Sequence, residues 1–506
     1  MSGPSLAKNP DALPLFSARS PPIGFGTLAT SSMRLATRSS SMRGRKVASA
    51  LWRGITILVF LGQLLNLLPW MSMNTLNRDL NSLARSVDHR PTDAVRWTKV
   101  LAHAPGFTVI ENLYWYNHTY ILLTEQPWHI PQQSHIANTY FEPDLSTNGH
   151  VPVKIWSIRN NPVSPEVKEE DQLGSTISLE RAVKLSEEAE ELQSPMMINN
   201  DSSFVSHMYH WIGEMFLGSW RVWSHYAFRS GLTLPDIKAV SFVRTYGRGE
   251  KPAGAENAEL WEDGPGANRW FTEKIFPGVT IESRTAWEAR AAAGKFAVIP
   301  LAILSDRTGG HYGPSSAWKP FGDVLRLPVL PDWLISLRDR LLSDYQGPVS
   351  LNRSTKTPKV LYLSRQGSGR ALAPNDHQRL VDSLKELQGE GLVDLEVTTF
   401  SSAIPFQEQV AKVSTSDILI SVHGNGLTHI MWMNPGASVF EIMPAGCTDY
   451  SPLAIVSGVQ HYMVRDTSFC VPRDCPQHVK VDPAVVTDQI RKIVAGRADD
   501  LREIPD

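Results

Sequence analysis

The sequence predicts an α/β protein with a doubly wound parallel sheet in its C-terminal part and one transmembrane helix near its N-terminus. Three observations support this fold class: a length of 506 residues, strand and helix patterns that alternate after residue 358, and an uncharged apolar run at residues 54–73. A chain of this length is expected to form two or three domains. Its 49 basic and 51 acidic residues leave a net charge of −2, which argues against a nucleic-acid-binding protein.

The N-terminal segment predicts a membrane anchor. Residues 1–53 are basic and lack apolar periodicity, so we expect a disordered cytosolic tail. The run at 54–73 has the length of a membrane helix, about 20 residues. Because the basic residues precede it, the positive-inside rule predicts a type II single-pass signal anchor with a lumenal body, in the Golgi or endoplasmic reticulum membrane. Gln63, Asn66 and Pro69 weaken the run, so a buried core helix or an uncleaved signal-like segment remains an alternative.

Two features fit a lumenal body. Sequons for N-glycosylation follow the apolar run, at Asn117, Asn200 and Asn352, and none precedes it. The three cysteines lie in the last quarter of the chain, and in an oxidising lumen the simplest pair is Cys470 with Cys475, which leaves Cys447 free.

We divide the rest of the chain into a polar stem at 74–97, an N-terminal domain at 98–346, a linker at 347–358 and a C-terminal domain at 359–506. The N-terminal domain contains strand patterns at 107–110, 113–116, 119–124 and 295–305, a charged segment at 166–193 that predicts an exposed helix or an insertion, and an aromatic-rich helix at 203–228. The dipeptide Asn117-His118 predicts a hairpin turn. In the aromatic-rich helix, core positions are expected at Trp211, Met215, Trp220 and Trp223.

The C-terminal domain has the more regular pattern. Strands are predicted at 359–364, 393–400, 417–422 and 438–443, and helices at 375–389, 405–415, 427–433 and 483–496. Asn375 is the expected cap of the first of these helices. Strands and helices that alternate in this way, with β-branched residues in the strands, predict a parallel doubly wound sheet.

A glycine-rich loop, His423-Gly424-Asn425-Gly426, directly follows the strand at 417–422 and precedes a helix. In a doubly wound sheet, ligands bind beyond the carboxyl ends of the strands. Glycines there let backbone N–H groups approach an anion, most often a phosphate, and the helix N-terminus favours negative charge. A plain strand-to-helix turn that needs glycine is an equally good interpretation of the pattern alone. The loop matches neither a dinucleotide nor a Walker A motif.

These residues resemble a known family. The stretch SVHGNGLTHIMWMNPGASVFEIMP, residues 421–444, is similar to the G-x-H-G-A-G-L-T-N…L-x-P-G-A-x-V-x-E-I-x-P signature of glycosyltransferase family 61. Residues 360–372, VLYLSRQGSGRAL, resemble its Y-[IL]-S-R segment, and residues 206–218, SHMYHWIGEMFLG, resemble its N-x-x-H-x-x-x-[DE] helix. Stretches at 106–124 and 304–324 are like those of fungal members. The chain departs from the pattern at Ser421 and Asn425, and at Glu214, where Asp is commoner.

The family includes plant β-1,2-xylosyltransferases, protein O-mannose β-1,4-N-acetylglucosaminyltransferases and EGF-domain O-GlcNAc transferases. The resemblance implies an inverting enzyme of the GT-B type, with two Rossmann-like domains that face a cleft. It would move N-acetylglucosamine or xylose from a UDP-sugar, its co-substrate, to a glycan or glycoprotein hydroxyl in the secretory pathway. The chain lacks an Asp-x-Asp motif, so we expect no metal and no other cofactor. The N-terminal domain would bind the acceptor and the C-terminal domain the nucleotide sugar.

Site residues follow from the resemblance together with the chemistry. Without a metal, the leaving diphosphate needs a guanidinium and backbone N–H groups, and the expected donor-binding residues are Arg365, His423, Gly424, Asn425, Gly426 and Glu441. Glu441 is expected to accept hydrogen bonds from the ribose hydroxyls. A surface salt bridge for Arg365 and a contact between strands for Glu441 are the alternatives.

Inverting transfer also needs a general base for the acceptor hydroxyl. His210, oriented by Glu214 four residues later, is the first candidate, and Asp306 and His311 are the others. For His210 the alternative is a hydrogen-bonded core histidine, and a zinc site formed by His207, His210 and Glu214 is a third possibility. Trp211 and Trp318 are candidates for stacking on acceptor sugars, although core packing is the more common role of such residues.

The alternative function is a catalytically inactive, membrane-tethered protein that binds a nucleotide sugar or a carbohydrate. A lumenal hydrolase is not favoured, because the sequence has no nucleophile elbow and no closely spaced pair of catalytic carboxylates.

Overall fold

The computed structural model describes residues 94–137, 152–157, 174–201, 205–233, 236–242, 261–263, 266–316, 320–346, 357–367, 370–401, 403–445, 450–469, 478–496 and 503–504. All of them belong to one compact unit, His89–Asp506. The predicted tail, anchor and most of the stem lie outside the described residues, as do Asn352, Trp318 and the three cysteines. In the part of the chain that is described, no helix is both long enough and apolar enough to cross a membrane.

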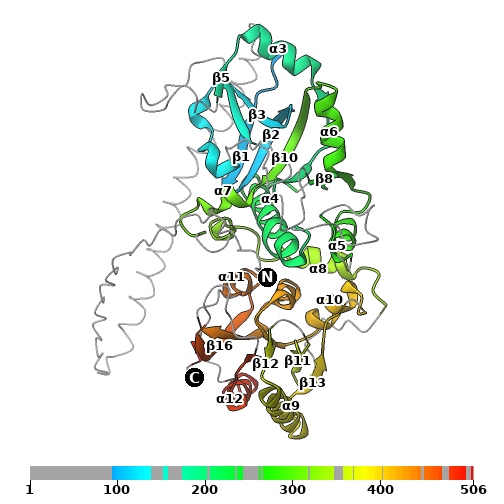
Figure 1. Ribbon diagram of the computed structural model, residues 1–506, viewed down its shortest axis with the longest axis vertical. Helices are drawn as coiled ribbons and strands as arrows, with labels where there is room; N and C mark the ends of the chain where they lie inside the picture. The colour runs from blue at the N-terminus through cyan, green and yellow to red at the C-terminus, as the bar shows by residue number, and fades with distance from the viewer. Residues whose placement is uncertain are drawn as a thin grey trace, which may run out of the picture. The chain divides into compact units, whose positions relative to one another are not determined.

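The N-terminal half is built on a sheet that has ten strands among the described residues (Figure 1). Its order is β5-β4-β3-β2-β10-β7-β8-β9, with β1 beside β2 and β6 beside β10. The strands are β1 Lys99–Ala104, β2 Phe107–Tyr116, β3 Thr119–Thr124, β4 Val153–Ser157, β5 Gly174–Thr176, β6 Glu190–Glu191, β7 Met196–Asn199, β8 Ala239–Phe242, β9 Thr280–Glu282 and β10 Ala297–Ser305. Strand β2 runs antiparallel to β1, β3 and β10, whereas the other pairs are parallel. The sheet is therefore mixed, and the expectation of a Rossmann-like N-terminal half is wrong in this respect.

The predicted hairpin is present between β2 and β3. Asn117 and His118 both have positive φ angles, 40° and 57°. Two successive residues with positive φ form the turn that matches the twist of antiparallel strands, and Asn is among the residues that tolerate it. Asn117 is exposed at this turn.

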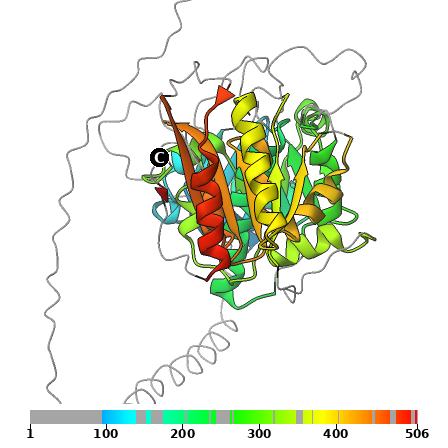
Figure 2. The same cartoon turned by 90° about the horizontal axis from the view of Figure 1, so that it is seen from below.

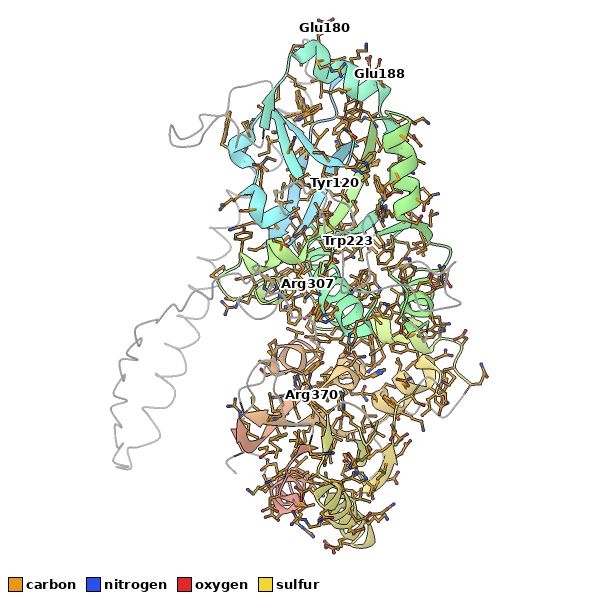
Figure 3. All side chains as sticks on the ribbon, in the orientation of Figure 1. Tyr120, Glu180, Glu188, Trp223, Arg307 and Arg370 are labelled. Atoms are coloured by element: carbon orange, nitrogen blue, oxygen red, sulfur yellow. The ribbon has the colours of Figure 1, made fainter. Side chains whose placement is uncertain are left out.

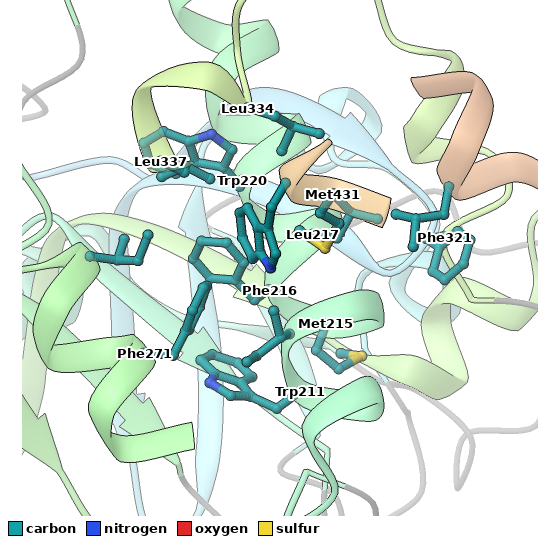
Figure 4. Close-up of a cluster of buried hydrophobic side chains, with 14 of the residues drawn as sticks. Trp211, Met215, Phe216, Leu217, Trp220, Phe271, Phe321, Leu334, Leu337 and Met431 are labelled. Carbon is teal, nitrogen blue, oxygen red and sulfur yellow. The ribbon is translucent and has the colours of Figure 1, made fainter. Parts of the chain in front are cut away.

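The helices of this half include the predicted aromatic-rich segment. They are α2 Gln133–Ile136, α3 Leu179–Glu188, η4 Tyr209–Phe216, α4 Leu217–Ser230, α5 Ala267–Ile275, α6 Arg284–Ala292, α7 Arg307–His311 and α8 Ile335–Leu342, with short 3₁₀ turns η2 Pro127–His129 and η5 Val324–Arg326. The segment η4 is a π-helix that continues directly into α4. Figure 4 shows Trp211, Met215 and Trp220 in the core with Phe271 of α5. The four predicted core positions of this segment are all buried.

The C-terminal half contains the predicted parallel sheet, with the order β13-β11-β14-β15-β16-β18 among the described residues. The elements are β11 Lys359–Leu363, β12 Ala371–Leu372, α9 Pro374–Gly389, β13 Asp394–Thr398, α10 Phe406–Ser414, β14 Ile418–Val422, η6 Asn425–Trp432, β15 Ser438–Ala445, α11 Ser451–Val456, β16 Gln460–Phe469, β17 His478–Val479, α12 Pro483–Val494 and β18 Glu503–Ile504. All neighbouring strands of the six-stranded sheet run parallel. Asn375 does not cap α9, because Pro374 occupies the first turn and Ala373 is the cap.

Helices cover both faces of this sheet. Helices α9 and α12 lie side by side on one face (Figure 2) and pack on the strands through Leu380, Leu384 and Ile490. On the other face, α10, η6 and α11 share a hydrophobic core with the N-terminal half. The aromatic rings of Phe271 and Trp432 meet in this core at a centroid distance of 6.0 Å. The two halves are therefore held together by apolar burial.

The strand order determines where a ligand can bind. If the six strands of this sheet are numbered 1 to 6 in chain order, their order across the sheet is 2-1-3-4-5-6. The first strand, β11, is therefore a neighbour of the third, β14. The chain leaves these two strands toward opposite sides of the sheet, and in doubly wound folds the ligand binds at the carboxyl ends where this occurs. Arg365 follows β11 at this place, and the loop at 423–426 follows β14.

Candidate active site

Arg365 and Gly424 are in direct contact. The Cβ that an alanine would add at Gly424 would lie 2.9 Å from Nη2 of Arg365 and would overlap its Nη1. Gly424 also has φ +151° and ψ −173°, a conformation that is almost exclusive to glycine. At Gly426 a Cβ would lie 2.7 Å from the Leu363 side chain. Because Gly424 and Gly426 have no side chains, the Arg365 guanidinium and Leu363 at the end of β11 can pack directly against the loop backbone. A site that binds an anion through backbone N–H groups and a guanidinium needs such a close approach.

A cavity of about 660 Å³ lies beside this contact and is bordered by both halves of the molecule. We call it the main pocket, and its residues include Met208 and Trp270 from the N-terminal half and Arg365, Phe406, Asn425 and Gly426 from the C-terminal half. Its volume is in the range of sites for small organic ligands.

Glu441 does not face the main pocket. It is fully buried on β15 and accepts hydrogen bonds from Nδ1 of His423, from Nε2 of His461 at 2.8 Å and from the backbone N–H of Tyr450 at 2.8 Å. Burial by itself would raise the pKa of Glu441, but the hydrogen bonds from the two histidines outweigh it and lower the pKa. The expected contact with ribose is therefore wrong, and Glu441 instead holds the His423 ring.

A second cluster joins η4 to the ends of β7 and β10. Nδ1 of His210 lies 2.7 Å from Oε2 of Glu214, so the structure brings these two residues together as the sequence suggests. Arg307, labelled in Figure 3, contacts the same Oε2 at 2.7 Å and Oδ2 of Asp201 at 2.6 Å. Burial alone would lower the pKa of Arg307, but the two carboxylates raise it, so this guanidinium is permanently charged.

Arg307 and Asp201 were not predicted from the sequence. Both lie just after strand ends, at the edge of a sheet where ligands and catalytic groups gather, and this position is the signal that could have identified them. The π-helix that carries His210 and Glu214 is a second signal, visible only in the structure, because π-helical turns are frequent at functional sites.

Two tyrosines connect the two clusters. The rings of Tyr209 and Tyr450 lie 5.2 Å apart between centroids, Tyr209 lies 5.3 Å from His210, and Tyr450 lies 5.4 Å from His423. Burial raises the pKa of both tyrosines, and Glu214 raises it further, so both remain protonated. Gly213 allows this approach, since a Cβ there would lie 2.9 Å from the Tyr209 ring and 3.1 Å from Cγ2 of Thr428 on η6.

Asp306 is a structural residue. It is fully buried, its Oδ1 accepts from the backbone N–H of Gly309 at 2.8 Å and caps α7, and its Oδ2 accepts from Nδ2 of Asn200 at 2.7 Å. With both oxygens occupied, the carboxylate is not placed to act as a base, which corrects that prediction. The same hydrogen bond corrects the glycosylation site at Asn200, because a fully buried amide cannot accept a glycan.

Of the residues expected to bind the acceptor, the structure describes Trp211 and His311. Trp211 is fully buried, packs on Phe242 at a centroid distance of 4.9 Å, and donates from Nε1 to Thr272 at 3.3 Å. It is a core residue and not a sugar platform. His311 is exposed on α7, with Nδ1 3.0 Å from the carbonyl oxygen of Ser316.

Among the residues that the structure describes, no three His, Cys, Asp or Glu side chains are grouped as metal ligands, and this includes His207, His210 and Glu214. Glu214 is instead paired with Arg307.

The chain is similar to known proteins over part of its length. Residues 208–440 match the model of the family Glycosyltransferase 61. The EGF domain-specific O-linked N-acetylglucosamine transferase of Drosophila melanogaster is 29% identical over 123 residues, 24% of this chain and 22% of that protein. The protein of the same description from Gallus gallus is 29% identical over 137 residues, 25% of this chain and 24% of that protein. The chain thus spans about a quarter of the length of these relatives. Among solved structures, a diflavin flavoprotein A3 from Nostoc sp. matches 28% of this chain and 89% of its own, with 14% identity and a TM-score of 0.17, which carries no structural argument.

Proposed function

We propose, from the match of residues 208–440 to the family Glycosyltransferase 61, that the chain is a metal-independent, inverting glycosyltransferase that uses a UDP-sugar. It transfers N-acetylglucosamine or xylose to a hydroxyl of a glycan or glycoprotein, without a cofactor. The relatives are EGF domain-specific O-linked N-acetylglucosamine transferases, which makes N-acetylglucosamine the first sugar to test. The two halves, which border the main pocket from both sides, take the GT-B roles of acceptor domain and nucleotide-sugar domain.

The contact between Arg365 and Gly424 carries this proposal. It places a guanidinium against bare backbone at the carboxyl ends of β11 and β14, beside the main pocket. When the bond between the sugar and the diphosphate breaks, its electron pair stays on the diphosphate oxygen. A guanidinium, the N–H groups of the loop at 424–426 and the ring of His423 are suited to stabilise that negative charge.

His210 is the proposed general base. The acceptor oxygen attacks the anomeric carbon from the face opposite the diphosphate, and its proton passes to His210. Nδ1 of His210 lies 2.7 Å from Oε2 of Glu214 and 3.3 Å from Nη2 of Arg307, so Nε2 is the nitrogen left to take the proton. Arg307 and Glu214 hold the ring in place, and the charge on Glu214 stabilises the imidazolium that forms.

Buried polar atoms support a ligand in the main pocket. Three residues at the pocket carry a buried atom that has no hydrogen-bond partner among the residues that the structure describes: Gln366 Oε1, Asn425 Oδ1 and His429 Nδ1. Such atoms are rare in native proteins, and a bound ligand is one of their explanations.

We also propose that the protein is a type II membrane protein of the Golgi or endoplasmic reticulum. The support is the basic segment at 1–53, the apolar run at 54–73 and the exposed sequon at Asn117. The proposed partners are the membrane, the UDP-sugar and a glycan or glycoprotein acceptor.

The test measures release of UDP from UDP-N-acetylglucosamine and UDP-xylose by the full chain, with and without glycoprotein acceptors. Arg365→Ala should abolish release, whereas Arg379→Ala, which removes an exposed guanidinium paired with Asp376 on α9, should leave it unchanged. Release by Arg365→Ala at the unmodified rate would overturn the donor-site assignment. Tight UDP-sugar binding with no release under any condition would favour the inactive binding protein instead.

A further inference from the structure

Tyr450 lies between the two polar clusters of the site. Only 6% of its surface is exposed, and its ring lies 5.2 Å from that of Tyr209 and 5.4 Å from that of His423, measured between centroids. Its backbone N–H donates to Glu441, but its hydroxyl group makes no hydrogen bond with the residues that the structure describes. The hydroxyl oxygen is not one of the polar atoms that these residues enclose completely, so a ligand can reach it. Because buried tyrosine hydroxyls usually have a hydrogen-bond partner, this one points to a bound ligand.

The two carboxylates near Tyr450 each have three polar partners already. The partners of Glu441 are His423, His461 and the backbone N–H of Tyr450. The partners of Glu214 are His210, Arg307 and the hydroxyl group of Tyr209. The hydroxyl group of Tyr209 is therefore occupied, whereas that of Tyr450 is left for a group that the described residues do not supply.

In the C-terminal half, Tyr450 is close to the proposed diphosphate site. Its neighbour His423 directly precedes Gly424, on which the Arg365 guanidinium lies. Burial raises the pKa of Tyr450, and the positive charges of Arg365 and of Arg370, which is labelled in Figure 3, act against this shift. The phenol is therefore near guanidinium groups that attract a diphosphate, and it keeps its proton.

In the N-terminal half, Tyr450 is one ring away from the proposed base. The Tyr209 ring contacts both Tyr450 and His210, at centroid distances of 5.2 Å and 5.3 Å. In a transfer with inversion, the anomeric carbon lies between the acceptor oxygen, beside the base, and the leaving diphosphate, beside the guanidinium. Tyr450 lies between these same two groups, so its hydroxyl group is placed to touch the reacting atoms.

We propose that Tyr450 is a catalytic residue whose hydroxyl group donates a hydrogen bond to the diphosphate oxygen that leaves the anomeric carbon. The proposal rests on the function proposed above and adds a donor for its leaving group. As the bond to the sugar breaks, the electron pair stays on this oxygen, and the phenol stabilises the charge while it keeps its own proton. The oxygen is a weak acceptor while it is bonded to the sugar and a strong one once it is charged, so the hydrogen bond acts mainly in the transition state.

Tyr450→Phe in the full chain tests this with the loss of one oxygen atom. The variant keeps the ring contacts with Tyr209 and His423 and the backbone hydrogen bond to Glu441. It should lower kcat for UDP release and for sugar transfer about 10- to 100-fold, the range expected for one hydrogen bond to a charged group. The KM for UDP-N-acetylglucosamine should stay unchanged, because the hydrogen bond forms as the charge develops.

Binding measurements give a second readout. In UDP, the terminal phosphate oxygen carries the charge that the leaving oxygen gains during transfer, whereas in UDP-N-acetylglucosamine this oxygen is bonded to the sugar. Calorimetry should therefore show that Tyr450→Phe lowers the affinity for UDP by at least about tenfold and leaves the affinity for UDP-N-acetylglucosamine unchanged. A merely structural role of the hydroxyl group would weaken the binding of both ligands equally.

The matched control is Tyr462→Phe. Tyr462 on β16 is also buried, and its hydroxyl group donates to Oε1 of Gln460 at 3.0 Å. This variant removes the same atom from a tyrosine in the core between the sheet and helices α9 and α12. It should keep the kcat and both affinities of the unmodified chain.

The proposal is wrong if Tyr450→Phe is folded and keeps the kcat of the unmodified chain, or if it weakens the binding of UDP and of UDP-N-acetylglucosamine equally. If the unmodified chain neither binds UDP nor releases it from a UDP-sugar, the proposed function fails first, and with it the proposal that depends on it. Should Tyr450→Phe fail to fold, a crystal structure of the unmodified chain with UDP decides. A terminal phosphate oxygen within about 3 Å of the Tyr450 hydroxyl would support the proposal, and the absence of any phosphate oxygen at hydrogen-bond distance would overturn it.

Discussion

Gly424→Ala tests the physical basis of the donor site. The added Cβ would overlap Nη1 of Arg365 and lie 2.9 Å from Nη2. To restore an ordinary contact of about 3.5 Å, the guanidinium must retreat by about 2 Å, beyond hydrogen-bond distance of a phosphate placed for the native side chain. A hydrogen bond to a charged group contributes about 1.5–3 kcal/mol, so the affinity for UDP should fall about 10- to 150-fold. The strained conformation at this position should add a loss of about 1–3 kcal/mol in the free energy of unfolding.

The matched control is Gly391→Ala. This glycine also has a positive φ, 73°, but an added Cβ would meet no atom within 4 Å. It should therefore lose stability without losing UDP affinity. Affinity is measured by calorimetry and stability by chemical denaturation on the same preparations. The reasoning is refuted if Gly424→Ala is folded and binds UDP as tightly as the unmodified chain, or if both glycine variants weaken binding equally.

Three further predictions concern the N-terminal half. Arg307→Met leaves two buried carboxylates without their cation and should lower the free energy of unfolding by about 3–5 kcal/mol. A loss below about 1 kcal/mol in denaturant titrations near neutral pH would contradict it. Trp211→Ala should cost about 3–5 kcal/mol of stability and leave the KM for the acceptor unchanged, and a selective rise in KM would restore the sugar-platform role. In a glycosylating host, Asn117→Gln should change the electrophoretic mobility of the protein, and loss of a glycan on mutation of Asn200 would show that this segment opens.

The C-terminal sheet was predictable because its strands and helices carry their own signals. The strands at 417–422 and 438–443 are rich in apolar and β-branched residues, and Leu380, Leu384 and Leu387 recur at helical spacing and are buried. The N-terminal sheet was not predictable in the same way. Apart from the local pairs β1–β2 and β2–β3, its antiparallel character depends on pairs such as Ile110 with Ala302, which are distant in sequence. No local pattern specifies such a pairing.

The site residues, like the two sheets, were predictable where a local sequence pattern identifies them and not where distant contacts decide their role. Arg365 and the loop at 423–426 could be found because both directly follow predicted strands of a sheet type whose ligands bind at that edge. Glu441 and Asp306 were assigned incorrectly, because their residue types suit a site but their environment decides their role. Glu441 is buried beside two histidines and holds the His423 ring. Asp306 accepts hydrogen bonds from two N–H donors and caps α7.

The amino-acid order by itself determined which segments form strands and helices and which loops carry bare backbone and polar side chains, since these depend on the periodicity and conformational preferences of neighbouring residues. Only the tertiary structure decided that Arg307 lies between two carboxylates, that Tyr209 and Tyr450 join the two clusters, and that His423 shares Glu441 with His461. Hydrogen bonds and ion pairs act over a few ångströms. Their partners are therefore chosen by how distant elements pack and not by their spacing along the chain.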